Sequence, residues 1–304
     1  MKVHVSVPAT TANLGPGFDA LGLALDLWNE TDLSLREDGK VQLTVRGEGQ
    51  NVLPLGADNM VARAALRLFE LTGEPCPGLQ IDCLNRVPLG SGMGSSSAAL
   101  LTGLLGANGL LGNPMSDEDL LYLAIEIEGH PDNVAPAMLG GLVVSMVKEG
   151  RAFSMRLSAE GDYAHLYVTI ALPDFYFPTH EARAILPDVV SWEKAVFNIS
   201  RAILVTEALR TGDLELLGRA MKDSLHQPYR MAQIPGSIDA LEAAKAAGAA
   251  AVALSGAGPS LIAFASGAAP EIGAGMKQAF KAAGLSARIF ELKVSPKGAG
   301  VMID

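Results

Sequence analysis

The chain has 304 residues, of which 49% are apolar, and 23 Lys and Arg against 33 Asp and Glu give a formal net charge of −10. The length suggests two domains, and the charge excludes a general binder of nucleic acid or of anionic membranes, because either partner would be repelled, while local anion sites stay open. The apolar stretches are too short to cross a bilayer, and the spacing of Cys76 and Cys83 favours free thiols in a reducing compartment, so we expect a cytoplasmic protein.

Strands open the chain, and one helix follows them. Apolar residues recur with a period of two over residues 3–7 and again over residues 33–45, which predicts strands. Residues 59–71 place their apolar side chains on one helical stripe, and residues 79–83 alternate once more. The first part of the chain is therefore predicted to mix strands with an amphipathic helix.

A glycine-rich segment without any charged residue covers residues 87–116 and includes the run PLGSGMGSSSAALLTGLLG. Its glycines at 90, 92 and 94 permit unusual backbone geometry, and serines 95–97 are expected to supply the cap and first-turn hydroxyls of an apolar helix. We expect this helix to be central and buried. Backbone N–H groups and the positive end of such a helix bind phosphate without side-chain charge. The segment lacks the lysine of a Walker A loop, and a tightly packed turn is the alternative interpretation.

A second polar motif, EIEGHPDN, overlaps the end of a helix predicted over residues 117–128. A lone carboxylate is usually solvated and a lone histidine simply hydrogen-bonded, but here Glu, His, Asp and Asn gather within residues 126–133 and run into an apolar segment. One carboxylate and one serine hydroxyl are enough for Mg²⁺, which completes its shell with water and phosphate oxygens. The motif therefore predicts a magnesium site beside polar substrate contacts.

The remaining motifs are weaker by themselves. PATTANLGPGFD, at residues 8–19, is a polar turn after the first strand, and SGAGPS, at residues 255–260, is explained equally well as a hairpin turn between two apolar runs. Arg183 and Arg230 are isolated cations, each either an ordinary surface residue or a group suited to carboxylate recognition.

The second half of the chain mixes strands and helices without a regular alternation. Strands are predicted over residues 166–172, 250–254, 260–264 and 287–292, and helices over residues 191–210, 214–224, 237–247 and 271–283. A polar stretch at residues 150–161 predicts a boundary that divides the chain into domains 1–155 and 156–304. This order of elements favours an α+β fold over a doubly wound sheet.

Taken in order, PATTANLGPGFD, PLGSGMGSSSAA, EGHPDNVAPAMLGG and SGAGPS resemble the motif set of the GHMP small-molecule kinases over residues 3–265. The NLGPGFD, HPDNVAPA, EARAILP and PYRMAQIPG segments are similar in detail to the homoserine kinase branch of that family. One departure is Met93, where the family loop usually has leucine, and this change nearly conserves side-chain volume. The resemblance implies a two-domain GHMP kinase fold: an N-terminal domain like ribosomal protein S5 domain 2, with an unusual left-handed βαβ crossover, and a ferredoxin-like C-terminal domain.

The resemblance also implies which residues form the site. The ATP phosphate loop would consist of Pro88, Leu89, Gly90, Ser91, Gly92, Met93, Gly94, Ser95, Ser96, Ser97 and Ala98. Ser96 and Glu126 would hold Mg²⁺, and Asn59 would lie near the adenine. The residues around L-homoserine would be Asn13, Asp19, His130, Asn133, Arg183, Arg230 and Gly256, and the catalytic set would be Asn133, Asp132 and Arg183. Asp19 suits an ammonium group and the two arginines suit a carboxylate.

The reaction that the resemblance implies is transfer of the ATP γ-phosphoryl group to the side-chain hydroxyl of L-homoserine in threonine biosynthesis, by a homodimer. Whether Asp132 removes a proton or only orders Asn133 stays open, and we favour direct transfer without a dedicated base. One alternative is another kinase of the family, acting on mevalonate or a sugar, although neither substrate has an ammonium group for Asp19. The other is a non-catalytic nucleotide-binding protein, although Ser96 and Glu126 are both present.

Overall fold

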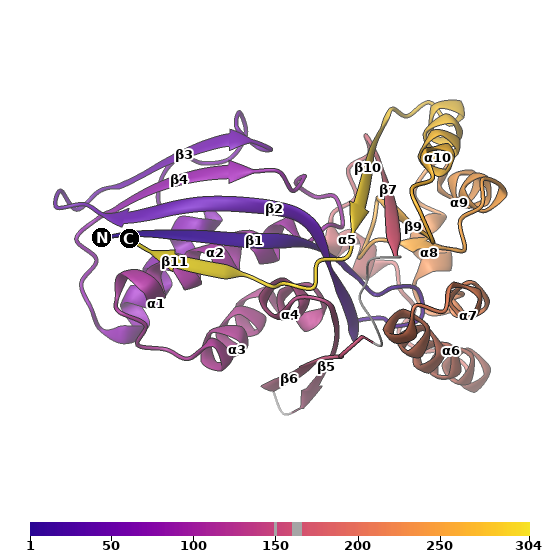
Figure 1. Cartoon of the computed structure of the whole chain (residues 1–304), viewed down its shortest axis with the longest axis horizontal. Coiled ribbons are helices and arrows are strands. Elements are labelled where there is room, and N and C mark those ends of the chain that lie inside the picture. Colours follow the sequence, from indigo (N-terminus) through magenta and orange to yellow (C-terminus); the bar gives the residue numbers. More distant parts are fainter. Residues whose placement is uncertain (149–150, 160–165) are drawn as a thin grey trace.

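The chain folds around two β-sheets that stand next to each other, each with its own helices (Figure 1). The structure is a computed structural model, and it describes residues 1–148, 151–159 and 166–304. The larger sheet holds the first strands of the chain and also the last one, because the final strand returns to pair with the first. The α+β prediction is thus confirmed.

The larger sheet has the strand order β11-β1-β2-β4-β3, and β5 and β6 extend it from the beginning of β2. Its strands are β1 (Lys2–Ala12), β2 (Leu21–Leu35), β3 (Val41–Gly47), β4 (Leu79–Asn85), β5 (Leu142–Lys148), β6 (Arg151–Arg156) and β11 (Gly300–Ile303). β3 and β4 pair in parallel and are joined through a helix, whereas the neighbours of β1 and β2 are antiparallel. Val3, Val5 and Val7 all point into the core, as their period of two predicts.

The helices of the first half cover one face of this sheet (Figure 1). They are α1 (Met60–Thr72), α2 (Ser95–Leu110), α3 (Asp117–Glu128) and α4 (Pro131–Leu139). α2 packs against α1 and β1 and is buried along almost its whole length, which confirms the central helix expected from its apolar sequence. A side chain at Gly103 would collide with the backbone of Val61, so the glycine lets α1 and α2 approach closely.

The smaller sheet is antiparallel, in the order β10-β7-β9-β8. Its strands are β7 (Tyr167–Pro173), β8 (Ala251–Leu254), β9 (Leu261–Ala265) and β10 (Ala287–Lys293), and the helices of this half are α5 (Thr179–Ala184), α6 (Trp192–Thr211), α7 (Leu214–Ala220), α8 (Gln227–Met231), α9 (Ser237–Ala246) and α10 (Pro270–Ala282). Successive side chains of β9 pack alternately into two different hydrophobic clusters. Ile262 and Phe264 join a cluster shared with β2, and Leu261 and Ala263 pack toward α9 and α10. The two halves are therefore joined by a common hydrophobic core.

Several predicted elements differ in extent from the observed ones. The helix predicted over residues 214–224 ends at Ala220, because the Asp223 carboxylate accepts hydrogen bonds from the backbone N–H groups of Leu225 and His226 and turns the chain toward α8. The predicted boundary between residues 155 and 156 falls inside β6, and residues 150, 160 and 161 of the predicted boundary region lie outside the described residues.

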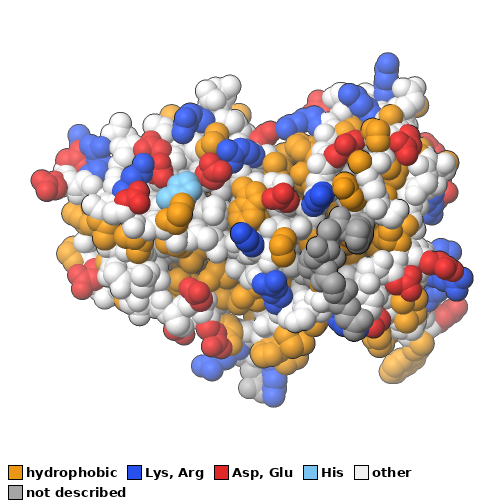
Figure 2. Space-filling view, in the orientation of Figure 1, with side chains coloured by type: hydrophobic (Ala, Val, Ile, Leu, Met, Phe, Trp, Pro, Cys, Tyr) orange, Lys and Arg blue, Asp and Glu red, His pale blue; other side chains and the backbone are white. Residues whose placement is uncertain are grey.

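The surface agrees with the charge balance of the sequence. Basic and acidic side chains are interspersed over the face seen in Figure 2. Among the helices that the structure describes, none combines the length and the apolar character that a membrane crossing requires.

Candidate active site

A polar cleft lies between the two halves of the chain, where the start of α2 faces the turn between β8 and β9. Its lining residues are Asn13, Asp19, Gly90, Ser91, Gly92, Gly94, Ser95, Ser96, Ser97, Glu128, His130, Asp132, Asn133, Phe177, Pro178, Thr179, Arg183, Arg230, Gly256, Ala257 and Gly258. All four sequence motifs thus contribute to one cleft, although they are spread over some 250 residues of the chain.

The glycine-rich loop presents the open N-terminus of α2 to the cleft. Gly94 is the N-cap residue, with a φ of 73°, and no side chain caps the helix there, so its first N–H groups and its positive dipole end are available to an anion. A side chain at Gly94 would collide with Thr10, and one at Gly92 would collide with the Ser255 carbonyl. Glycine is therefore required at both positions, and the loop is a tightly packed turn that leaves the N-terminus of α2 open to the cleft.

Hydrogen bonds from both halves of the chain hold this loop in place. The N–H of Thr10 donates to the Met93 carbonyl at 3.1 Å, and the Ser255 hydroxyl donates to the Gly92 carbonyl at 2.7 Å. Ser255 also lies 3.0 Å from the Thr11 hydroxyl. The loop is thus fastened to β1 on one side and to the β8–β9 turn on the other.

The carboxylate beside the loop serines is Glu128 and not Glu126. The Ser96 hydroxyl donates to Glu128 Oε2 at 3.0 Å, and the Ser97 hydroxyl donates to Glu128 Oε1 at 3.1 Å. Glu126, two residues earlier on α3, is exposed and does not line the cleft. The structure therefore does not bring the predicted metal pair, Ser96 and Glu126, together, because the helical turn directs these two glutamates to different sides of α3.

Asn59 lies outside the cleft as the N-cap of α1. It is 4% exposed, its Oδ1 accepts from the Val61 N–H at 3.0 Å, and its Nδ2 donates to the Pro54 carbonyl at 2.9 Å. Both ends of the amide are thus engaged within the protein. The resemblance implies a position near the adenine, whereas these two internal hydrogen bonds lead us to expect a structural role, and the following substitution distinguishes the two.

Replacing Asn59 by alanine is expected to lower the free energy of unfolding by about 1 kcal/mol, because an N-cap hydrogen bond is lost. The KM for ATP is expected to stay near the wild-type value. Urea denaturation and ATP titration of the reaction measure the two quantities. A large rise in the KM for ATP without a loss of stability would instead assign Asn59 to the nucleotide site.

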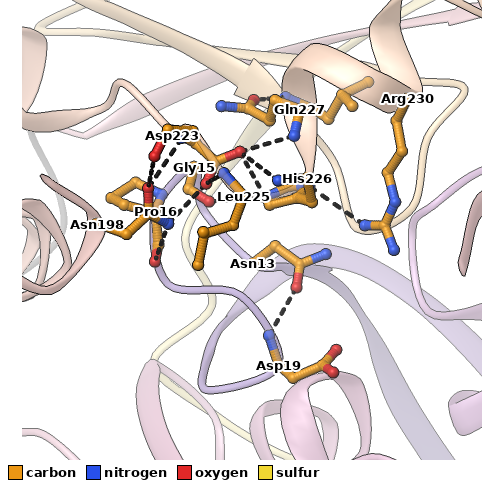
Figure 3. A network of polar contacts seen from close by, with 12 residues as sticks. Asn13, Gly15, Pro16, Asp19, Asn198, Asp223, Leu225, His226, Gln227 and Arg230 are labelled. Atoms are coloured by element: carbon orange, nitrogen blue, oxygen red, sulfur yellow. Dashed lines mark hydrogen bonds and ion pairs between the residues drawn. The ribbon is translucent and has the colours of Figure 1, made fainter. Parts of the chain in front are cut away.

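The turn between β1 and β2 carries two polar residues in the left-handed region of backbone space. Asn13 has a φ of 68° and Asp19 a φ of 56°, a conformation that non-glycine residues adopt only under constraint. Asn13 supplies the constraint, because its Oδ1 accepts from the Asp19 N–H at 2.9 Å (Figure 3). Its Nδ2 also donates to the Gly256 carbonyl at 2.8 Å. The turn is therefore held in a fixed shape that directs Asp19 into the cleft.

The HPDN motif forms the beginning of α4, on the side of the cleft next to the glycine-rich loop. Asp132 is buried, and its Oδ1 lies 2.9 Å from Nδ1 of His130. This hydrogen bond raises the pKa of His130 above its ordinary value. The Asn133 side chain accepts from the Thr10 hydroxyl at 2.9 Å, which ties the motif to β1.

Two arginines from the second half reach the cleft beside Asp19. Arg183, on α5, makes a two-pronged ion pair with Asp19 at 2.8 and 3.0 Å. Arg230, on α8, is only 1% exposed, and burial lowers its pKa to about 10, so it remains a cation at neutral pH. Both guanidinium groups lie near the ring of Phe18, at 5.7 and 5.1 Å from its centroid. One carboxylate and two guanidinium cations therefore lie close together in this part of the cleft.

The cleft includes most of the residues predicted from the sequence and adds others. Asn59, Pro88, Leu89, Met93, Ala98 and Glu126 do not line it. Met93 and Ala98 are instead buried core residues that anchor the loop and α2. Sequence reasoning missed Glu128, Phe177, Pro178, Thr179 and Ala257. Of these only Glu128 carried a signal, since it stands beside His130 in the same motif.

Comparisons with known proteins agree with these features. The family pattern described as "GHMP kinases N terminal domain" matches residues 59–141, and "GHMP kinases C terminal" matches residues 205–282. The chain is 45% identical to the homoserine kinase of Moorella thermoacetica over 98% of its own length and 99% of the relative's. It is 41% identical to the homoserine kinase of Carboxydothermus hydrogenoformans, over 99% and 97% of the two chains.

Solved structures give the same result. The crystal structure of homoserine kinase from Cytophaga hutchinsonii matches with a TM-score of 0.88 at 35% identity, over 99% of this chain and 97% of that one. L. major mevalonate kinase, solved in complex with R-mevalonate, matches with a TM-score of 0.73 at 15% identity, over 96% of each chain, which reflects the shared fold alone. The two-domain fold that the motifs imply is thus confirmed.

Proposed function

We propose the following reaction for this chain, which belongs to the GHMP kinase family and, within it, to the homoserine kinases. The enzyme transfers the γ-phosphoryl group of ATP to the side-chain hydroxyl of L-homoserine and yields O-phospho-L-homoserine and ADP. This is the substrate and reaction class that the sequence motifs predict.

The observation that carries the proposal is the pairing of an anion cradle with a site of alternating charge in one cleft. The open N-terminus of α2 suits the phosphates of a nucleotide. Beside it, Asp19 suits the ammonium group of an amino acid, and Arg183 and Arg230 suit its carboxylate. A zwitterion can thus replace the direct contact between Asp19 and Arg183 by contacts of its own with both. Mevalonate and sugars have no ammonium group that Asp19 could bind.

Ser96, Ser97 and Glu128 form the group that fits Mg²⁺. No set of three or more His, Cys, Asp or Glu residues in the described ranges is placed to hold an ion alone. One carboxylate with neighbouring hydroxyls nevertheless matches the usual coordination of Mg²⁺, which retains several water ligands and binds phosphate oxygens of the nucleotide. We therefore assign Glu128 the metal-ligand role that the resemblance gives to Glu126. A bound Mg²⁺ neutralises phosphate charge and orients the transferring group.

The protein itself contributes positioning and backbone dipoles to the transfer. The N–H groups at the start of α2 stabilise charge on the phosphate oxygens, and the Asp19, Arg183 and Arg230 side chains hold the amino acid so that its hydroxyl points toward the loop. Asp132 is engaged by His130, whose raised pKa favours an imidazolium next to it, and this leaves the carboxylate as an orienting group. We propose direct attack by the hydroxyl, with no dedicated base, and with Asn133 as a further contact.

A substrate panel tests the proposal. Release of ADP is followed by a coupled assay with L-homoserine, mevalonate, galactose and shikimate at matched concentrations. We expect turnover with L-homoserine and little or none with the other three, because only L-homoserine supplies an ammonium group to Asp19. Turnover of another substrate while L-homoserine stays inert would contradict the proposal, and ATP binding without any turnover would favour a non-catalytic nucleotide-binding protein.

We further propose that the chain is a cytoplasmic homodimer. The exposed face of α6 supports a second copy as its partner, since Trp192, Val196, Ile199 and Ile203 are 87%, 60%, 61% and 65% exposed and follow one another at helical spacing. Light scattering of the purified protein is expected to give a dimer mass, and Ile199→Glu with Ile203→Glu is expected to give monomers. A monomer mass for the wild type would contradict this assignment.

A further inference from the structure

A buried polar network lies next to the part of the cleft that contains Asn13 and Asp19 (Figure 3). The side chains of Asp223 and His226 are fully buried, and Arg230 is 1% exposed. Groups of this kind are kept inside a protein only where each of them has partners. The network joins α6, the segment before α8, and the turn between β1 and β2.

His226 lies at the centre of this network and makes two hydrogen bonds with different parts of the site. Its Nε2 donates to the Gly15 carbonyl at 2.8 Å, and its Nδ1 lies 3.2 Å from Nη1 of Arg230. A guanidinium only donates and a carbonyl only accepts, so Nδ1 must be the acceptor and the imidazole must be neutral with its proton on Nε2. Burial lowers the pKa of His226 and favours the same neutral form.

The position of His226 is fixed on every side. The Asp223 carboxylate accepts from the backbone N–H groups of His226 at 2.9 Å and Gln227 at 2.7 Å, and from the Asn198 side chain at 2.7 Å. The ring of Phe18 stacks on the imidazole with 5.0 Å between centroids and 22° between planes. The ring therefore cannot turn away from its two hydrogen-bond partners without disturbing several others.

Arg230 depends on such a partner for its orientation. Its Nε donates to the Ala182 carbonyl at 3.0 Å, its Nη1 donates to His226, and within the described part of the chain Nη2 has no acceptor. Arg230 also lines the cleft, so Nη2 is the edge left for a ligand. Loss of the His226 acceptor would leave only one hydrogen bond, from Nε to Ala182, together with the Phe18 ring, to set the direction of Nη2.

We propose that His226 is a positioning residue for substrate recognition: it locks Arg230 and the Asn13–Asp19 turn into one rigid unit that fits the carboxylate and ammonium groups of an α-amino acid at the same time. This rests on the proposed function, which gives Arg230 and Asp19 those two groups. His226 touches neither substrate nor nucleotide and acts only through Arg230 and Gly15.

Three substitutions separate the two hydrogen bonds of His226. His226→Phe keeps a ring against Phe18 and removes both bonds, His226→Asn keeps an acceptor near the Nδ1 position, and His226→Gln keeps a donor near the Nε2 position. We expect His226→Phe to raise the KM for L-homoserine by about tenfold or more, as the loss of a hydrogen bond to a charged group predicts, while the KM for ATP and kcat change little. His226→Asn is expected to recover most of the loss, because it retains the partner of Arg230.

The matched control is His180→Phe, since His180 stands on α5 with its side chain 82% exposed and outside the cleft. It is expected to leave both KM values unchanged. Thermal unfolding of every variant shows whether a change in KM comes with a loss of folding, and a His226→Phe protein that raises both KM values in parallel overturns the proposal.

A double-mutant cycle tests whether His226 acts through Arg230. Arg230→Lys removes the planar guanidinium, and we expect His226→Phe to have a much smaller effect on the KM for L-homoserine in this background than in the wild type. Independent, additive effects overturn the proposal. A wild-type enzyme that does not phosphorylate L-homoserine at all contradicts the proposed function instead, so the two failures are distinct.

Discussion

Replacing Glu128 by glutamine is expected to lower kcat by about 10²–10³-fold, the effect of losing several kcal/mol of metal-based stabilisation of transferring phosphate. The substitution keeps acceptor and donor atoms for the Ser96 and Ser97 hydroxyls but removes the negative charge that a divalent cation needs. Raising the Mg²⁺ concentration is expected to restore part of the activity, because weaker binding can be offset by mass action.

Glu126→Gln provides the matched control, because it makes the same change of charge on the same helix two residues away. Glu126 is exposed and outside the cleft, so its variant is expected to retain near wild-type kcat. Steady-state kinetics at several Mg²⁺ concentrations compare the two. An inactive Glu126 variant beside an active Glu128 variant would return the metal role to Glu126, the residue that the family resemblance implies.

Replacing Asp19 by asparagine is expected to lower kcat/KM for L-homoserine by about 10–100-fold, since a charge-assisted contact with an ammonium group is lost. The loss should depend on the amine of the substrate. 4-Hydroxybutanoate has the same hydroxyl and carboxylate without the amine, so it is expected to be a poor substrate for the wild type and to lose much less on the substitution. Comparison of kcat/KM for the two substrates in the wild type and in Asp19→Asn gives the coupling energy between the Asp19 carboxylate and the substrate amine directly.

Asp26→Asn serves as the control for this prediction, because Asp26 is an exposed residue on β2 whose carboxylate accepts a hydrogen bond from the Trp28 indole and does not line the cleft. It should change neither substrate's kinetics. Equal losses for L-homoserine and 4-hydroxybutanoate in Asp19→Asn would show that the residue orders the turn and does not meet the ammonium group. The carboxylate would then act only through its ion pair with Arg183.

The glycine-rich loop and the helix after it could be predicted because their signals are local. An uncharged segment with glycines at alternate positions and serines ahead of an apolar run is explained by a turn and a buried helix, and α2 begins at Ser95 as expected. The one local error concerns the cap. Gly94 takes the N-cap position without a side-chain cap, and the Ser96 and Ser97 hydroxyls donate to Glu128.

The choice between Glu126 and Glu128 needed the packing of α3. Leu121, Ala124 and Ile125 form its buried stripe, and residue 128 continues that stripe at helical spacing whereas residue 126 does not. The sequence thus contained a usable signal in the period of the apolar residues. It was overlooked because both glutamates precede the same histidine and no spacing rule for a metal site separates them.

α4 was not predicted because its sequence argues against a helix. Pro136 inside it cannot donate to the Asp132 carbonyl, and two glycines follow directly. Strand β2, which lies outside the helix, packs closely against the turn of α4 that contains Pro136. A side chain at Gly22 would collide with that same carbonyl, so β2 lies directly against it. This is a contact between residues about a hundred positions apart, and no local pattern could reveal it.

The two hydrogen bonds that hold the glycine-rich loop in place affect the free energy of nucleotide binding. Met93 is tied to β1 and Gly92 to the β8–β9 turn before any ligand arrives. The conformational entropy of this loop is therefore lost when the chain folds and not when ATP binds. Binding energy from the phosphates is then available for orienting the γ-phosphoryl group, and a change that loosens either tie should weaken ATP binding without altering any atom that ATP contacts.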